Sequence, residues 1–274
     1  MAGNVQRKGE VMKAVLAALL LVCTQAFAQA DYPNKPVRLV VSFAAGGISD
    51  VLARALAIPL GRQLGQQVIV ENKPGAGTTI AADYITRVPP DGYTIWLQDI
   101  TTHAINAALY SKLPYDSMKD FTYIAMVAST PLMLVVHPST PAHNVRELIA
   151  LLKANPGKYS YGSSGNGTIL HLAVELYFEA AGLKVRHIPY KGVGPMVTDL
   201  IGGQIDFGTL ALPSVQQHIK SGALRAIGMA TKDRVPAAPD IPTFVEQGVP
   251  GYESGTWQGV VAPRGRHRSW TSHW

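Results

Sequence analysis

VRLVVSFAAGGISD, residues 37–50, is the stretch that decides the fold. Its first five residues, 37–41, form an apolar run interrupted only by Arg38, which is typical of a strand buried in a parallel sheet. Gly46 and Gly47 then precede a pattern of helical periodicity that begins near Asp50. A strand, a glycine loop and a helix start present backbone N–H groups to an anion. The stretch therefore predicts an α/β fold with an anion site at the end of this strand.

The same alternation continues along the chain. Apolar runs of strand length alternate with amphipathic helical patterns, and clusters of glycine and proline mark the turns. The expected strands are Val37–Phe43, Val68–Glu71, Thr94–Gln98, Leu132–His137, Tyr159–Ser163, Val185–Tyr190, Ile205–Thr209 and Leu224–Ala230, and the expected helices cover 50–64, 78–87, 103–110, 144–154, 169–181, 193–201 and 213–221. This order indicates parallel sheets that are covered by helices on both faces.

A second loop repeats the pattern of the first. The segment KYSYGSSGNG, residues 158–167, is an expected strand followed by small residues, and a helix is expected to begin near Thr168. Ligands of open α/β sheets bind at the carboxyl ends of the strands. Two α/β lobes, each with an anion-binding loop, are therefore expected to face each other across a cleft.

Length and composition indicate a globular protein. The chain has 274 residues, of which 47% are hydrophobic and 15% are charged, as in proteins of one or two domains. The formal net charge is +6. Basic residues do not form a stripe interleaved with aromatic residues, so no nucleic-acid partner is predicted.

The first thirty residues predict a cleaved export signal. Lys13 provides a positive charge, Ala14–Cys23 is an apolar core of ten residues, and 26–30 contain the small residues that precede a cleavage site. Ten apolar residues are too few to span a bilayer. Cys23 is the one cysteine, and the bulky Val22 before it argues against a lipoprotein. A mature chain without cysteine has no disulfide, cysteine-zinc site or catalytic thiol, and we expect a periplasmic location.

The glycine loops do not match nucleotide-binding motifs. A phosphate-binding loop needs Gly-Lys followed by Ser or Thr, but the sequence at 157–159 is Gly-Lys-Tyr. The dinucleotide fingerprint needs a third glycine three residues after the second. That position is Ile80 after GAG at 75–77 and Leu170 after GNG at 165–167. Spacing therefore excludes both motifs, while a carboxylate remains compatible with the backbone of the first loop.

Catalytic and metal sites have weak support in the sequence. Ser163, Ser164 and His171 are residue types used by serine hydrolases, but no G-x-S-x-G motif is present. His171 and Glu175 lie one helical turn apart, without an H-E-x-x-H motif or an evident third ligand. Together with Glu179 they form a polar stripe that is typical of a solvated helix face. No catalytic residue, metal or cofactor is predicted.

Nine motifs, in this order, resemble the substrate-binding receptors of tripartite tricarboxylate transporters, also called the Bug family. Each motif alone is weak, but the ordered set covers nearly the whole chain. The motifs are YPNKP (32–36), AAGGISD (44–50), ENKPGAG (71–77), PDGYT (90–94), LPYD (113–116), ANPGK (154–158), SSGNG (163–167), PYKG (189–192) and GGQID (202–206).

The resemblance implies a periplasmic binding protein of type II, with two α/β lobes, a ligand cleft and two crossovers. After a signal peptide at 1–30, lobe 1 would comprise 31–133 and 252–274, and lobe 2 would comprise 134–251. Residues 257–263 are similar to the family's return crossover into lobe 1. Family members continue from there through further helices, whereas RGRHRSWTSHW (264–274) has no apolar periodicity. We therefore expect lobe 1 to lack its closing elements.

The resemblance also implies the function. Family ligands are small carboxylates, so we expect a receptor for a di- or tricarboxylate or an aromatic acid, which would be held between the two loops by backbone N–H groups. The residues expected to bind it are Phe43, Ala45, Gly46, Gly47, Ser49, Asp50, Thr101, Thr102, Ser163, Ser164, Gly167, Thr168 and His171. The expected partner of this monomer is a membrane permease. The alternative is a ligand sensor that signals to a partner without transport.

Two departures from the family pattern carry expectations of their own. Pro59 lies inside the first expected helix, where its ring clashes with the carbonyl of Ala55, so the helix is expected to kink or end there. The loop at 209–212 reads TLAL and contains no acidic residue. We therefore expect no ammonium group to bind at that loop, which favours a plain organic acid as the ligand.

Overall fold

The computed structural model describes residues 32–249 and 251–265. The expected export signal, and the tail from residue 266 onward, lie outside the described residues. The described chain from Lys35 onward forms one compact unit. None of the described helices combines the length and the apolar character that crossing a membrane requires.

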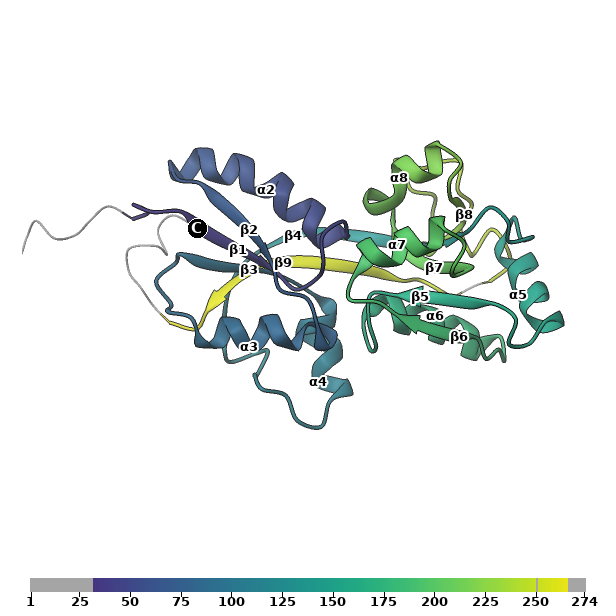
Figure 1. The fold of residues 1–274 in the computed structure, drawn as a ribbon, viewed down its shortest axis with the longest axis horizontal. Coiled ribbons are helices and arrows are strands. Elements are labelled where there is room, and N and C mark those ends of the chain that lie inside the picture. The colour runs from purple at the N-terminus through teal and green to yellow at the C-terminus, as the bar shows by residue number, and fades with distance from the viewer. Residues whose placement is uncertain (1–31, 250, 266–274) are drawn as a thin grey trace, which may run out of the picture. The chain divides into compact units, whose positions relative to one another are not determined.

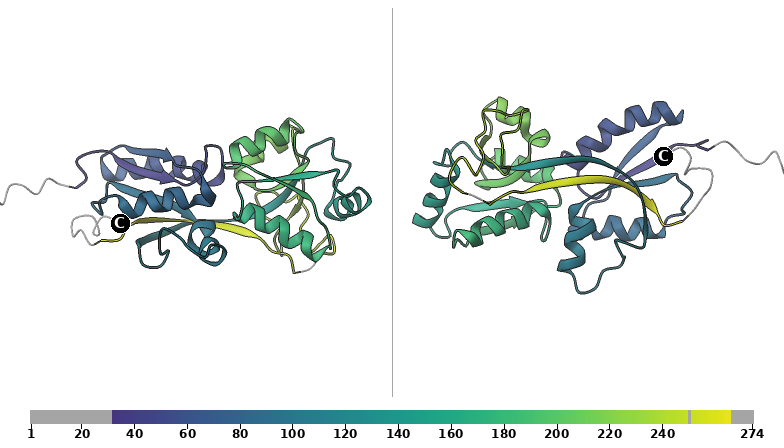
Figure 2. Two further views of the ribbon diagram at one scale, coloured as in Figure 1. Left: turned by 60° about the horizontal axis from the view of Figure 1, so that its bottom comes forward. Right: turned by 180° about the vertical axis from the view of Figure 1, so that it is seen from behind.

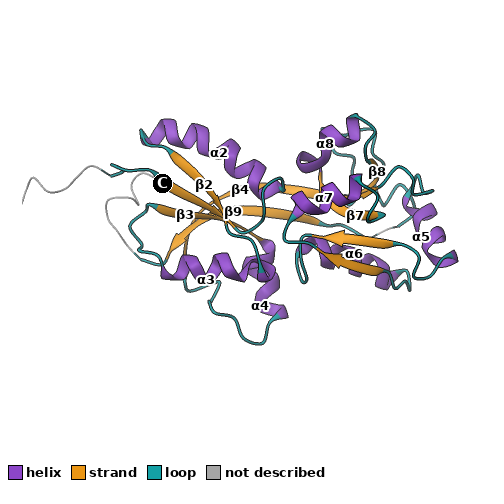
Figure 3. Cartoon of the chain, viewed as in Figure 1, coloured by secondary structure: helices purple, strands orange, loops and turns teal. Residues whose placement is uncertain are grey.

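A mixed sheet of nine strands runs through the described residues, with helices on both of its sides (Figures 1 and 3). The strands are β1 (Val37–Val41), β2 (Val68–Asn72), β3 (Thr94–Asp99), β4 (Phe121–Val136), β5 (Ser160–Ser163), β6 (Arg186–Pro189), β7 (Phe207–Ala211), β8 (Arg225–Met229) and β9 (Gly255–Pro263). The helices are α2 (Ile48–Leu64), α3 (Thr79–Arg87), α4 (Asn106–Leu109), α5 (Val145–Ala154), α6 (Ile169–Ala180), α7 (Val193–Ile201) and α8 (Leu212–Lys220).

Parallel pairing dominates at both ends of the sheet. β1 pairs in parallel with β2 and β3, and β5 pairs in parallel with β6 and β7. α2 and α3 lie on opposite sides of the first group of strands (Figure 1). Such strand–helix–strand units bury the strands on both faces, which explains why β3 is buried at every position and β1 at every position except Arg38. The predicted α/β fold is confirmed.

Two antiparallel strands connect the two parallel groups. The strand order is β2-β1-β3-β9-β4-β7-β5-β6, with β8 also paired to β4. β4 pairs with β9 over residues 121–131 and with β7 over residues 132–136, so one long strand belongs to both groups (Figure 2). The sequence predicted only the second part, Leu132–His137. The first part was missed although residues 121–128 are apolar except for Thr122 and favour a strand. This part is only partly buried, and it pairs with β9.

The first group of strands has its own buried core. Trp96 of β3 is fully buried and packs with Phe121, with ring centroids 5.1 Å apart. Its indole N–H donates to the Ser42 hydroxyl at 2.8 Å. That bond satisfies a polar group that would be costly to bury alone, and it fixes the residue that precedes the first loop.

α2 does not end at Pro59, in agreement with the helix expected at 50–64. The helix continues for 17 residues, with Pro59 inside it. Proline removes one backbone hydrogen bond, which leaves the carbonyl of Ala55 without its partner. Both residues are exposed, so water can solvate this carbonyl, and the helix continues to Leu64.

Candidate functional site

The loop between β1 and α2 is shaped by one carboxylate. Asp50, in the first turn of α2, accepts hydrogen bonds from the N–H of Gly46 (3.1 Å), from Arg54 Nε (3.1 Å) and Nη2 (3.0 Å), and from Asn72 Nδ2 (3.0 Å). Asn72 Nδ2 also donates to the carbonyl of Phe43 at 2.9 Å. Burial opposes the ionisation of Asp50, but the bonds from Arg54, Asn72 and Gly46 outweigh it and lower its pKa. The ionised carboxylate of Asp50 therefore holds the first loop in its conformation.

The loop between β5 and α6 is crosslinked by its own hydroxyl groups. Ser163 Oγ donates to the carbonyl of Gly165 (3.0 Å) and accepts from its N–H (3.1 Å). Ser164 Oγ donates to Thr168 Oγ1 (3.1 Å), which donates to the same carbonyl (2.8 Å). Gly165 has a φ of +137°, which residues with a side chain rarely adopt. These bonds give the second loop one shape.

Two stacked histidines hold the second loop from its inner side. His171 Nδ1 accepts a hydrogen bond from the Gly167 N–H at 3.1 Å, and His187 Nε2 lies 2.7 Å from Ser163 Oγ. Their ring centroids are 4.0 Å apart, at an interplanar angle of 17°. Burial lowers the pKa of His171, and burial together with the adjacent His171 lowers the pKa of His187 to about 4. The hydrogen bond from the Gly167 N–H requires that His171 Nδ1 carries no proton.

We expect stability to fall as the pH drops from about 6.5 to about 4. The unfolded chain protonates His187 near 6.5, whereas the folded chain does so only near 4. The unfolded state thus binds more protons in this window, so the free energy of unfolding decreases with decreasing pH. Thermal unfolding at several pH values should show a shallower decline for His187→Asn. His143→Asn, at an exposed position, should keep the wild-type slope; equal slopes in all three proteins would contradict this role of His187.

The first loop lies directly against the segment between β6 and α7. The Ala44 N–H donates to the Lys191 carbonyl at 3.4 Å. A Cβ atom on Gly194 would lie 2.2 Å from the carbonyl oxygen of Ala45, and one on Gly192 would lie 2.8 Å from the Ala44 nitrogen. The close approach of these backbones therefore requires glycine on the α7 side.

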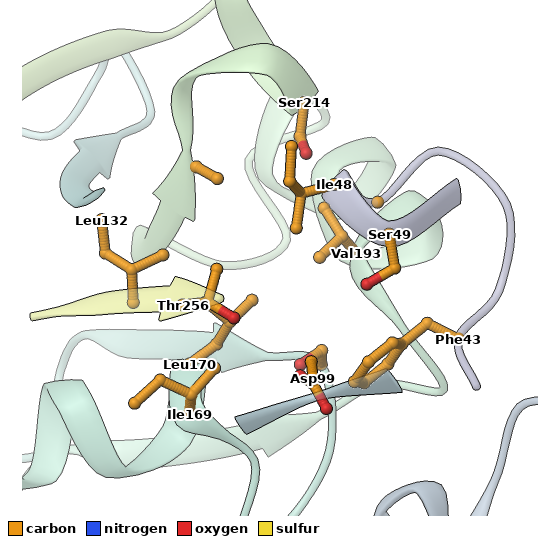
Figure 4. Close-up of a pocket in the computed structure, with 13 residues that line it drawn as sticks. Phe43, Ile48, Ser49, Asp99, Leu132, Ile169, Leu170, Val193, Ser214 and Thr256 are labelled. Carbon is orange, nitrogen blue, oxygen red and sulfur yellow. The ribbon is translucent and has the colours of Figure 1, made fainter. Parts of the chain in front are cut away.

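A first cavity lies between the two loops (Figure 4). It is lined by Phe43, Gly47, Ile48, Ser49, Asp99, Leu132, Ser164, Ile169, Leu170, Val193, Ala211, Ser214 and Thr256. Leu132 and Leu170 lie on one side, and Phe43, Ser49 and Asp99 lie on the other. The cavity thus has an apolar end and an end with polar groups, as small-molecule sites usually have.

A second, more polar cavity of about 730 Å³ shares Phe43 and Ser164 with the first. Its lining includes the segment Gly75–Thr78 and Lys191. Thr78 has a φ of +80°, a conformation that is unfavourable for a β-branched residue and that occurs mostly at functional sites. The motif at 71–77 contributed to the resemblance, but no residue from it was predicted to bind the ligand.

The structure gathers the predicted residues around the loops, but only some of them line these two cavities. Phe43, Gly47, Ser49 and Ser164 do so. The predicted residues that line neither are Ala45, Gly46, Asp50, Thr101, Thr102, Ser163, Gly167, Thr168 and His171. Several of these shape the site: Thr101 Oγ1, for example, accepts a hydrogen bond from the Ile169 N–H at 3.2 Å, at the start of α6. Ligand contact by any of the thirteen stays a prediction.

Asp99, at the end of β3, was missed by the sequence analysis. It is only 3% exposed, and its Oδ1 accepts from the Thr102 N–H (3.2 Å) and Thr102 Oγ1 (3.3 Å). Burial raises its pKa to about 6, although hydrogen bonds from Thr102 and Thr101 oppose the shift. A signal was present in the sequence, because an acidic residue directly follows the expected strand Thr94–Gln98, at the strand end where ligands of such sheets bind.

The hydrolase and metal interpretations gain nothing from the geometry. Ser163 contacts His187 rather than His171, and it is fully buried, while Ser164 contacts Thr168. Among residues 32–249 and 251–265, no group of three or more His, Cys, Asp or Glu side chains is placed to hold a metal ion.

Known proteins similar to this chain are solute-binding receptors, not enzymes. The tripartite tricarboxylate transporter family receptor matches residues 52–269. The solved periplasmic binding protein BugD is 37% identical, with a TM-score of 0.85, over 88% of this chain and 81% of that one. Rpa4515 of R. palustris, solved with adipate, is 37% identical, with a TM-score of 0.85, over 89% and 82% of the two chains. MatC of Rhodopseudomonas palustris, with bound malate, is 30% identical, with a TM-score of 0.83, over 88% and 82%.

Proposed function

This chain belongs to the tripartite tricarboxylate transporter receptor family, and on that premise we propose that it binds a small organic carboxylate in the periplasm and delivers it to a membrane permease. The ligand would be a di- or tricarboxylate or an aromatic acid. Two similar structures contain such acids, adipate and malate. The acid would be released unchanged.

The observation that carries this proposal is the position of two helix starts at one cavity. The N-cap residues of α2 and α6, Gly47 and Thr168, provide no capping side chain; of the α6 start, the Ile169 N–H is bonded to Thr101 Oγ1. Residues of the two first turns, Ser49 and Leu170, line the first cavity. N–H groups in the first turn of a helix have no intrahelical partner, and the helix dipole adds a partial positive charge there. A carboxylate between the two helix starts would therefore be attracted from both sides.

The division into lobes is part of the proposal. Residues 31–133 with 252–274 would form one lobe and 134–251 the other, after cleavage of a signal peptide at 1–30. The separate parallel groups around β1 and β5 support this division. A ligand held by both loops would favour the closed arrangement, because it contacts both lobes only there. The permease would then recognise the closed, ligand-bound monomer.

A panel of acids tests the binding function. We expect at least one of adipate, malate, citrate and benzoate to raise the melting temperature by about 5 °C or more at a concentration of roughly 100 Kd, since such binding adds about 2.7 kcal/mol to the stability. Adipamide and benzamide are matched controls that lack the charge, and they should have no effect. Calorimetry would confirm each positive result. If neither these acids nor a wider set of organic acids binds, the proposed function is wrong.

A further inference from the structure

The charge of Asp99 has no partner in the described part of the chain. None of the ion pairs between described residues includes Asp99, and its hydrogen bonds come from the uncharged residues Thr101 and Thr102. Asn, Ser or Thr could provide the same cap for the turn that follows β3. A buried charge without a counterion is unfavourable, so capping alone does not explain why an acid stands here.

The surroundings of Asp99 lead into the proposed ligand site. Asp99 lines the first cavity together with Ser49 and Ser164, and the lining contains no Lys, Arg or His. In Figure 4, Asp99 and Ser49 lie toward the same side of the cavity, away from Leu132. The hydroxyl of Ser214, another lining residue, has no hydrogen-bond partner. Because no cationic side chain lines this cavity, a cation that faces Asp99 from within it would have to come from a bound molecule.

We propose, resting on the carboxylate-binding function above, that Asp99 is a specificity-determining residue: the bound acid presents a hydroxyl or ammonium group to Asp99, and an acid with a second carboxylate in that place is rejected. A donor facing a buried carboxylate forms a strong, charge-assisted hydrogen bond. A second carboxylate would meet like charge in a site of low dielectric constant. The apolar end around Leu132 and Leu170 accommodates the hydrocarbon or aromatic body of the acid.

This assignment changes an expectation from the sequence. The loop at 209–212 contains no acidic residue, from which the sequence predicted that no ammonium group binds there. Asp99 brings a carboxylate into the same cavity from β3, and Ala211 of β7 also lines that cavity. An amino acid or hydroxy acid is therefore compatible with the site, through a different strand.

Four acids built on the same phenylacetate core test the proposal. Phenylacetate, mandelate, phenylglycine and phenylmalonate differ only in whether the carbon beside the carboxylate carries hydrogen, hydroxyl, ammonium or a second carboxylate. By calorimetry at neutral pH, we expect mandelate or phenylglycine to bind the wild-type protein at least about tenfold more tightly than phenylmalonate. In Asp99→Asn, which keeps the shape and a capping oxygen, this ratio should fall to about threefold or less.

Two further variants control the comparison. Asp116→Asn makes the same change at a turn where the Asp116 side chain is partly exposed and accepts from the Met118 N–H at 2.9 Å, and it should keep the wild-type ratio. Asp99→Ser removes the charge with a different capping group, in case Asp99→Asn fails to fold. Tight phenylmalonate binding by the wild type, or an unchanged ratio in both Asp99 variants, would overturn the proposal. If none of the four acids binds while adipate or malate does, the proposal for Asp99 is overturned as well, but the proposed carboxylate-binding function stands.

Discussion

Gly194→Ala is expected to weaken carboxylate binding by about 10- to 100-fold without unfolding the protein. A Cβ at this position would lie 2.2 Å from the Ala45 carbonyl oxygen, whereas real Cβ atoms essentially never approach another atom closer than 3.0 Å. The Cβ is fixed to the backbone of α7 and the carbonyl belongs to the backbone of the first loop, so neither can turn away, and the loop and α7 would have to separate. Overpacking of this kind costs about 1–3 kcal/mol. It destabilises the arrangement in which both loops contact the ligand, so the affinity for the ligand falls.

The helix itself should tolerate the change. Gly194 does not have a positive φ, and alanine favours a helix over glycine by about 1 kcal/mol. Gly202→Ala, at the other end of α7, is the matched control, because its Cβ would lie at an ordinary 3.4 Å from the Thr198 carbonyl. Calorimetry with the tightest-binding acid of the panel, and thermal unfolding without it, separate affinity from stability. Wild-type affinity in Gly194→Ala would mean that the loop and α7 do not approach this closely in the bound state.

Asp99→Asn is expected to make the protein more stable at neutral pH, by up to about 3 kcal/mol. Burial raises the pKa of Asp99 from 3.8 to about 6. Between these values the folded state binds more protons than the unfolded state, so the wild-type protein loses stability as the pH rises through this window. Asparagine does not ionise and avoids that loss. The gain should therefore be full above about pH 7 and shrink toward pH 4.

Urea unfolding of the wild type and the variant near pH 7 and near pH 4 measures this difference. Asp116→Asn serves again as the control, since the pKa of the partly exposed Asp116 is lowered by hydrogen bonds from Lys119 and Met118, and it should give no such gain at neutral pH. A stability difference for Asp99→Asn that is the same at both pH values would show that ionisation of Asp99 is not its cause. A gain would fit a group retained for binding at the expense of stability.

Local patterns were sufficient for much of the fold. The run 37–41 became β1, the helix predicted at 193–201 became α7, and the ordered motifs identified the family. These features depend on neighbouring residues, whose spacing sets which side chains a strand or helix can bury. The first part of β4 was not predicted as a strand, although its residues favour one. The helix expected at 50–64 does not end at Pro59, because water can solvate the exposed carbonyl of Ala55.

The site divides in the same way. The sequence found both loops, since a strand, small residues and a helix start are adjacent in the chain. It did not assign a role to His187, Gly194 or Asp99. His187 contacts Ser163 from the neighbouring parallel strand, and Gly194 contacts Ala45 from a helix about 150 residues further along the chain. Contacts between such distant residues have no fixed sequence spacing, so no local motif predicts them.

The sequence by itself determined the family, the α/β class and the two glycine-containing loops, because these follow from periodicity and from the order of short motifs. Only the tertiary structure decided which groups surround the space between the loops. It placed the carboxylate of Asp99 in a cavity whose lining holds no counterion, and it brought α7 against the backbone of the first loop at Gly194. The energy of the Asp99 charge depends on its burial, and the energy of the contact at Gly194 depends on a distance. Both are set only when segments far apart in the chain pack together.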